Sequence, residues 1–194
     1  PVLEELVSAG LLPNLIVTVP DRPQGRKLAV TPPPMKNWAD KHGIPVVQPE
    51  SFSKEVLAQL REIKADCFIV TSYGKIIPQK VLEIPRTGTL NVHPSLLPKY
   101  RGSSPIESAI LADDKATGVT IMQMDSKMDH GPIIAQEKVV FDEWPCKADV
   151  YRTLAQRGGK LLVSLLSDWV AGKITPHKQE HDQATYCKKF TKQD

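Results

Sequence analysis

Cysteine is scarce in this sequence, and long hydrophobic runs are missing. The three cysteines, Cys67, Cys146 and Cys187, are odd in number and widely spaced. Such spacing fits neither a disulfide framework nor a zinc site, so we expect no metal and a reducing compartment. No apolar stretch reaches the roughly 18 to 20 residues of a membrane-spanning helix, and the first residues lack the pattern of a secretion signal. We therefore expect a soluble protein that has no membrane partner.

The sequence also lacks a strong charge of either sign and a glycine-rich phosphate cradle. The net charge of +3, from 25 basic and 22 acidic residues, is too small to require a polyanionic partner. Without a P-loop or dinucleotide-type glycine pattern, no nucleotide cofactor is indicated. An apolar fraction of 41% and a charged fraction of 24% are ordinary for a folded protein, and 194 residues suffice for one domain.

Strand-like and helix-like segments alternate along the chain. Helical patterns are predicted over residues 1–10, 35–41, 53–63 and 105–114, and over 147–170 with an interruption at Gly158 and Gly159. Strand-like runs are predicted over residues 15–19, 44–48, 66–72, 87–93, 117–124 and 132–140. Residues 20–34 are expected to form a loop, and the chain turns polar from residue 171. This alternation favours an α/β fold with an open, mostly parallel sheet, whose last two runs pair antiparallel.

Asn91 and His93 stand two residues apart at the end of a predicted strand, so their side chains share one face. A carboxamide and a protonated imidazole can both donate to a tetrahedral oxyanion, which indicates attack on a carbonyl. Asp129, in a polar turn, is the leading candidate to hold the charge of the imidazole or move a proton, ahead of Asp125 and Asp142. The pattern leaves open that His93 is a hydrogen-bonded structural residue, the commoner case for a lone histidine.

Two further segments could line a binding site. TSYGKIIP, at residues 71–78, leaves a buried-type strand through a glycine into an apolar turn, as in a pocket wall at a sheet switch point. An ordinary strand-to-helix connection explains it equally well. The stretch around PDRPQGR collects Arg22, Arg26, Lys27 and Lys36 and could contact phosphates, although a solvated basic loop is the usual explanation for such a cluster.

Several motifs together resemble the formyltransferase domain of the methionyl-tRNA formyltransferase family. They are NVHPSLLPKYRGSSPI at 91–106, TGVTIMQMDSKMDHGPII at 117–134, TSYGKIIP at 71–78 and PDRPQGR at 20–26. The motifs occur in the family's order, and the resemblance covers nearly the whole chain. It implies a Rossmann-like sheet with helices on both faces. It also implies transfer of a formyl group from 10-formyltetrahydrofolate to the amino group of methionine on initiator tRNA, in translation initiation.

The resemblance also implies roles for individual residues. The family's catalytic asparagine, histidine and aspartate fall on Asn91, His93 and Asp129. Its folate-binding residues fall on Ser95, Leu96, Leu97, Pro98, Tyr73, Gly74, Ile76 and Ile77. Its tRNA-acceptor loop resembles the stretch that carries Arg22, Arg26 and Lys27. We accordingly expect a monomeric cytoplasmic enzyme of bacterial type, an organelle being left open, with 10-formyltetrahydrofolate as co-substrate and no metal.

The family pattern implies a catalytic domain over residues 1–172, without the family's first strand, and a linker over 173–194 toward a C-terminal domain. Without that strand, we expect exposed apolar edges and unpaired backbone groups in the sheet. Two alternatives stay open. Enzymes that formylate glycinamide ribonucleotide or amino sugars are similar at the Asn, His and Asp positions but would not be expected to carry PDRPQGR. A non-catalytic folate- or tRNA-binding fragment is the other.

Overall fold

The computed structural model describes residues 1–24 and 28–190, so the predicted tRNA contacts Arg26 and Lys27 lie outside the described residues. The helices are α1 (Val2–Ser8), α2 (Pro34–Lys41), α3 (Lys54–Glu62), α4 (Gln79–Leu82), α5 (Pro105–Leu111), α6 (Lys147–Val170) and the 3-10 turn η1 (His181–Gln183). The strands are β1 (Ile16–Val17), β2 (Arg22–Gln24), β3 (Ala29–Thr31), β4 (Val46–Val47), β5 (Phe68–Val70), β6 (Thr89–His93), β7 (Arg101–Gly102), β8 (Ala116–Gln123), β9 (Ile133–Val140) and β10 (Tyr186–Cys187).

The largest sheet has four strands in the order β5-β6-β8-β9. β6 lies parallel to β5, with Asn91 opposite Val70, and antiparallel to β8, with His93 opposite Thr120. β8 and β9 pair antiparallel, as the sequence predicts for these two runs. A separate parallel pair joins β1 to β4. The Rossmann-like α/β fold is confirmed, and the antiparallel pairing of β6 with β8 is a feature that the alternation of runs does not indicate.

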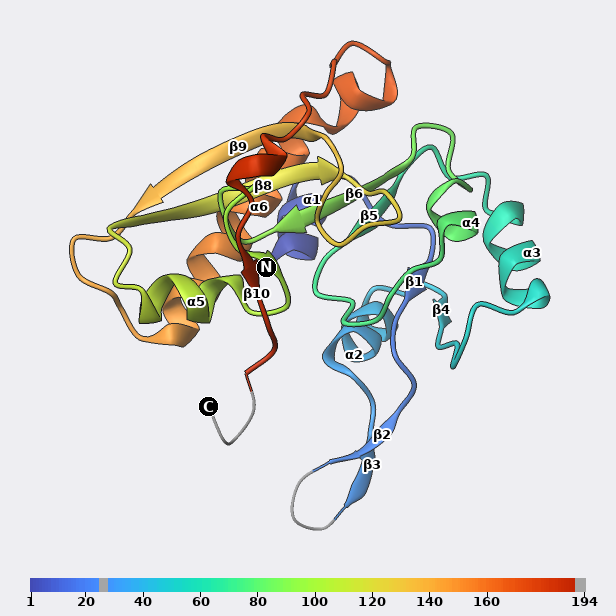
Figure 1. The fold of residues 1–194 in the computed structure, drawn as a ribbon. Coiled ribbons are helices and arrows are strands. Elements are labelled where there is room, and N and C mark those ends of the chain that lie inside the picture. The colour runs from blue at the N-terminus through green and yellow to red at the C-terminus, as the bar shows by residue number, and fades with distance from the viewer. Residues whose placement is uncertain (25–27, 191–194) are drawn as a thin grey trace.

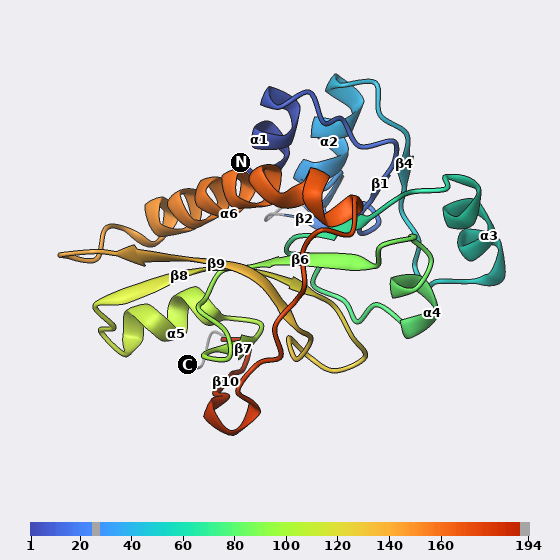
Figure 2. The same ribbon diagram turned by 90° about the horizontal axis from the view of Figure 1, so that it is seen from above.

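Helices cover both faces of the sheet, with α1 and α6 on one face and α5 on the other (Figure 2). Leu90 and Val92 of β6 point into the core on the α6 side, where Leu162 packs against them. Each fully buried side chain of this size contributes about 1.5–3 kcal/mol. Because successive strand residues face opposite ways, burial of Leu90 and Val92 turns Asn91 and His93 toward the α5 side.

Helix α6 runs without a break through Gly158 and Gly159, so the predicted interruption is wrong. A Cβ on Gly158 would lie 2.6 Å from Val92 Cγ1, and a Cβ on Gly159 would lie 3.1 Å from Val2 Cα. Glycine in a helix interior costs about 1 kcal/mol relative to alanine. Here the two glycines allow α6 to approach β6 on one side and α1 on another, so they serve close packing instead of ending the helix.

The predicted loop over residues 20–34 contains a β-hairpin, which corrects that prediction for β2 and β3. The two strands pair antiparallel, with Arg22 opposite Thr31. In Figure 1 the hairpin projects away from the rest of the molecule. Val30 is 68% exposed, so its β-branched side chain supports the strand through local backbone preference and not through burial.

Candidate active site

Asn91, His93 and Asp129, here called the polar cluster, converge beyond the end of β6. Asn91 Nδ2 lies 3.4 Å from Asp129 Oδ1, and His93 Nδ1 lies 3.7 Å from the same oxygen. The first two side chains come from one face of β6, and Asp129 comes from the turn that joins β8 to β9. The structure therefore brings together the three residues that the sequence predicts to act together.

His93 is held with one ring nitrogen already engaged. Its Nε2 lies 3.0 Å from the Tyr100 carbonyl oxygen, which can only accept a hydrogen bond, so Nε2 carries a proton. Nδ1 is then the nitrogen that can gain or lose a proton, and it faces Asp129. Burial lowers the pKa of His93 below its ordinary 6.5, while the Asp129 charge and the bond to Tyr100 act in the opposite direction. His93 is thus neutral near pH 7, with the lone pair on Nδ1.

Asp129 is fixed through both its carboxylate and its backbone. Its Oδ2 accepts a hydrogen bond of 2.8 Å from the Gly102 N–H, and its carbonyl oxygen accepts one of 2.9 Å from Gln179. Its φ of 46° lies in the left-handed region, which aspartate tolerates better than most residues. The side chain is 13% exposed, so its charge acts in a setting of low dielectric at short range.

The polar cluster suits a reaction at a carbonyl carbon. Asn91 carries a carboxamide donor, and the free Nδ1 of His93 can accept a proton. The Asp129 carboxylate stabilises the imidazolium that forms when it does. A positioned donor and a positioned base are the elements that a reaction through a tetrahedral oxyanion requires.

The predicted folate-binding segment, Ser95 to Pro98, follows β6 directly. Ser95 and Leu97 are buried, and their polar groups are engaged within the protein. The Ser95 hydroxyl donates to the Lys99 carbonyl at 2.6 Å, and the Leu97 N–H donates to Thr120 at 3.1 Å. Leu96 and Pro98 are half-buried. Within this segment, Leu96 and Pro98 are therefore the residues whose side chains keep accessible surface.

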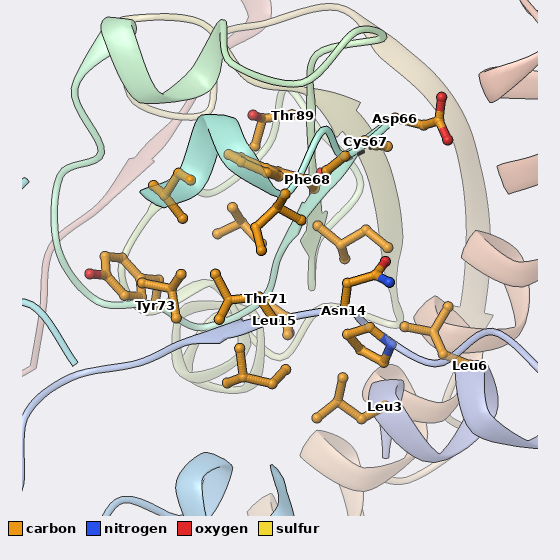
Figure 3. A pocket seen from close by; sticks show the side chains of 18 of the residues that line it. Leu3, Leu6, Asn14, Leu15, Asp66, Cys67, Phe68, Thr71, Tyr73 and Thr89 are labelled. Atoms are coloured by element: carbon orange, nitrogen blue, oxygen red, sulfur yellow. Dashed lines mark hydrogen bonds between the residues drawn. The ribbon is translucent and has the colours of Figure 1, made fainter. Parts of the chain in front are cut away.

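Of the other predicted folate-binding residues, two line a hollow and two are exposed to solvent. Tyr73 and Ile77 line an apolar hollow of about 500 Å³ (Figure 3). Gly74 is exposed, and Ile76 is 92% exposed. No member of the polar cluster lines this hollow. The hollow that Tyr73 and Ile77 line is therefore separate from the polar cluster.

This hollow lies between two strands whose facing edges are unpaired. Among the described residues, β1 pairs only with β4, and β5 only with β6. The N–H groups of Ile16 and Thr18 donate toward β4, so alternation turns those of Leu15 and Val17 toward the hollow. Figure 3 shows apolar side chains from α1, β1 and β5 around the space. Two apolar strand edges thus face each other here without pairing.

Arg22 is the predicted tRNA contact that the described residues include. It lies in β2, with its guanidinium 3.8 Å from Glu50, and both side chains are largely exposed. At the base of the hairpin, Asp21 accepts hydrogen bonds from Gln48 at 2.6 Å and Lys36 at 3.1 Å. These bonds, the one from Gln48 first, lower the pKa of Asp21. Lys36 therefore anchors the hairpin, while Arg22 stays accessible.

Several groups around the polar cluster were not predicted. The Tyr100 carbonyl and the Gly102 N–H belong to the backbone, which carries no side-chain signal. Gln179 lies in the polar tail, where no periodic pattern marks a buried residue, yet it is 5% exposed. The only available hint was that KYRG directly follows the predicted folate segment.

All three cysteines are free, and burial raises the pKa of the Cys67 thiol to about 11. Within residues 1–24 and 28–190, no group of three or more His, Cys, Asp or Glu side chains is placed to hold a metal ion. Across the same residues, no helix combines the length and the apolar character needed to cross a membrane.

Sequence comparison relates this chain to known proteins. The formyl transferase family profile matches residues 10–166. Over 191 residues the chain is 44% identical to the methionyl-tRNA formyltransferase of Halorhodospira halophila. This alignment covers 98% of this chain and 62% of that protein. The chain thus spans about three fifths of the length of the curated relatives it matches, 62% in each of three cases.

Solved structures show the same fold. Phosphoribosylglycinamide formyltransferase from Bacillus halodurans superposes with a TM-score of 0.67 at 31% identity, covering 86% of this chain and 88% of that chain. The formyltransferase PseJ from Anoxybacillus kamchatkensis superposes with a TM-score of 0.64 at 26% identity, covering 90% of this chain and 85% of that chain. The PseJ structure is a complex with UDP-4,6-dideoxy-4-formamido-L-AltNAc and tetrahydrofolate.

Proposed function

This chain belongs to the formyl transferase family, and we propose that it transfers a formyl group from 10-formyltetrahydrofolate to the amino group of methionine on initiator tRNA. Relatives named methionyl-tRNA formyltransferase, at 41–46% identity along nearly the whole chain, support this acceptor. The observation that carries the chemistry is the polar cluster, in which a buried histidine and an aspartate meet at 3.7 Å beside an asparagine. We place the activity in the cytoplasm, because translation initiation takes place in that compartment.

In the proposed reaction the methionyl amine attacks the formyl carbon, and a tetrahedral oxyanion forms. Asn91 donates a hydrogen bond to the developing negative oxygen. A donor that is already in place when the charge appears stabilises the transition state without reorganisation. Removal of one such donor typically costs a factor of about a hundred to a thousand in turnover.

The proton of the amine passes to His93 Nδ1. The Tyr100 carbonyl keeps the Nε2 proton in place, so Nδ1 is the nitrogen available as a base. The imidazolium then lies beside the Asp129 carboxylate, which stabilises it. When the bond from the formyl carbon to the donor nitrogen breaks, His93 passes this proton on to the leaving donor nitrogen, and His93 is neutral again.

The formyl donor is proposed to bind along the loops that follow β5 and β6. Tyr73, Gly74, Ile76 and Ile77 form the first loop, and Ser95, Leu96, Leu97 and Pro98 form the second. In the second loop, Leu96 and Pro98 would supply the contact surface, because Ser95 and Leu97 are buried and hydrogen-bonded. The tetrahydrofolate in the PseJ structure supports a folate donor for this fold.

The tRNA acceptor is proposed to bind the hairpin that carries Arg22, with Arg26 and Lys27 following in the sequence. Arg22 is accessible, and basic side chains contribute to tRNA affinity through the phosphates. We propose residues 1–172 as the catalytic domain and residues 173–194 as the beginning of a linker. On this proposal, the family's C-terminal domain would add further contacts to the tRNA.

A second candidate is formylation of a small amine. The similarity to phosphoribosylglycinamide formyltransferase, at 31% identity over 86% of this chain, favours it. The experiment is a comparison of three acceptors with the same formyl donor: charged initiator methionyl-tRNA, glycinamide ribonucleotide and an amino-sugar nucleotide. We expect transfer to methionyl-tRNA. Transfer to either small molecule alone would contradict the tRNA assignment.

A further inference from the structure

The segment from His177 to Cys187, here called the strap, lies against the turn that carries Asp129 and against β7, whose Gly102 N–H binds the Asp129 carboxylate. His177 and Ile133 exchange two backbone hydrogen bonds of 2.7 Å, four residues after Asp129. At its other end, β10 pairs parallel with β7, which begins three residues after Pro98 of the predicted folate segment. In Figure 1 this last part of the chain descends from the end of α6 across the sheet toward β10. The strap is therefore tied to the site at two places.

Gln179 is the side chain through which the strap holds the turn at Asp129. Its Nε2 donates to the Asp129 carbonyl at 2.9 Å and to the Gly131 carbonyl at 2.7 Å. Its Oε1 accepts two hydrogen bonds from Arg101, at 3.1 Å and 2.6 Å. Both donor hydrogens and both acceptor positions of the carboxamide are thus used, which locks its orientation.

The turn needs such support because its backbone is left-handed at Asp129 and closely packed at Gly131. Asp129 adopts a φ of 46°. A Cβ on Gly131 would overlap the carbonyl oxygen of Gln123. A left-handed residue followed by a closely packed glycine persists where surrounding contacts specify it. Gln179 provides two of these contacts.

The strap also acts on the carboxylate of Asp129 through β7. Arg101 and Ser103 donate their N–H groups to the strap carbonyls of Thr185 and Cys187. By alternation, the Gly102 N–H points the other way, and it donates to Asp129 Oδ2 at 2.8 Å. A Cβ on Gly102, whose φ is 116°, would collide with the Cys187 carbonyl oxygen. The backbone of β10 therefore packs on the glycine that orients the carboxylate.

Arg101 joins these two contacts and depends on the strap for its side-chain partners. Its guanidinium bonds to Gln179, to the Tyr186 hydroxyl at 3.2 Å and to His181 Nδ1 at 2.9 Å. The residue is only 1% exposed, and within the described part of the chain no ion pair joins it to a carboxylate. A buried guanidinium needs its donors satisfied, and the strap provides the acceptors.

We propose that two contacts of the strap, the Gln179 side chain and the β10 backbone, shape the formyl-transfer site, and that Gln179 is a positioning residue that sets the place of Asp129 beside His93. This inference rests on the proposed function for its catalytic consequence. It assigns to the middle of the expected linker a role in the chemistry. The strap holds Asp129 by the carbonyl through Gln179 and by the carboxylate through Gly102.

The first test compares Gln179→Glu and Gln179→Leu with Glu180→Gln, an exposed neighbour that serves as the control. Glutamate at position 179 still accepts from Arg101 but cannot donate to the two carbonyls, so it keeps the strap in place and releases the turn. We expect both Gln179 variants to lower kcat about tenfold or more, with KM for the formyl donor within about twofold, and Glu180→Gln to match the native protein. An unchanged kcat in folded Gln179→Glu would overturn the proposal.

A double-variant cycle separates positioning from a general loss of structure. If Gln179 acts through Asp129, Gln179→Glu in the Asp129→Asn background lowers kcat little further. If the double variant instead lowers kcat by the product of the two single-variant factors, Gln179 does not act through Asp129. Because Gln179→Leu removes the acceptor for Arg101 and could unfold the strap, Gln179→Glu is the variant that decides, with thermal unfolding measured beside it.

A third measurement needs no turnover, so it separates failure of this proposal from failure of the proposed function. The groups that face the His93 ring are the Asp129 carboxylate and the Tyr100 carbonyl. Displacing Asp129 therefore lowers the pKa of His93, which proton NMR reports from its ring hydrogens. We expect a lower pKa in Gln179→Leu, which removes the two donated hydrogen bonds without adding a charge, and an unchanged one in Glu180→Gln. An unchanged pKa in folded Gln179→Leu would overturn the positioning role, whatever acceptor the enzyme uses.

Discussion

His93 Nδ1 lies 3.7 Å from Asp129 Oδ1, while the opposite ring nitrogen of His93 is held by the Tyr100 carbonyl at 3.0 Å. The distance is too long for a hydrogen bond and short enough for strong electrostatic coupling. The pair is therefore poised for a proton that arrives during the reaction. This relationship underlies the predictions on catalysis below.

The pH dependence of kcat should report His93. Burial lowers its pKa, so the base is neutral above that value, and kcat is lost as the pH falls through it, below the ordinary 6.5. Asp129 raises the pKa of His93, so Asp129→Asn should move this acidic limb to still lower pH. Asp125→Asn, in the same turn, is the control and should leave the limb in place. A limb that moves upward in Asp129→Asn would contradict the assignment.

Basic residues within the 20–34 segment should govern use of the tRNA. Arg26→Ala should raise KM for methionyl-tRNA, with an effect that shrinks as salt screens the phosphates, and Arg22→Ala should act in the same direction. KM for the formyl donor should stay the same in both. Arg61→Ala, an exposed arginine on α3, provides the control. If donor affinity falls and tRNA use does not, the hairpin has another role.

Gly158→Ala should destabilise the protein although alanine is the better helix former. The added methyl would lie 2.6 Å from Val92 Cγ1, in the core behind the polar cluster. Overpacking of this kind costs about 1–3 kcal/mol, partly offset by about 1 kcal/mol of helix propensity. Chemical denaturation should show the loss, and Lys160→Ala, exposed on the same helix, should change stability by less than about 0.5 kcal/mol. A stabilised Gly158→Ala would contradict the close-packing explanation.

The fold and the polar cluster follow from local patterns to a large extent. Alternation along β6 predicts that Asn91 and His93 share a face, and the buried Leu90 and Val92 enforce it. Asp129 was predicted because it lies in a polar turn between two strand-like runs. These inferences succeed because the relevant contacts depend on strand periodicity and on the pairing of neighbouring runs.

Other features depend on contacts that no local pattern encodes. Gly158 and Gly159 resemble a helix break in sequence, and only the approach of Val92 and Val2 gives them another explanation. Gln179 lies 50 residues from Asp129 in the chain, and its partners are backbone carbonyls. The hairpin was missed because prolines and charged residues dominate the composition of the 20–34 stretch.

The most direct test of the central claim is a single-turnover measurement of formyl transfer with both substrates saturating. Under these conditions the rate reports the chemical step and not substrate binding. We predict that His93→Ala and Asp129→Asn each slow this step by about a hundredfold or more, because a proton acceptor or the charge that stabilises it is lost. A near-native single-turnover rate in both folded variants would contradict the assignment of the polar cluster as the formyl-transfer centre.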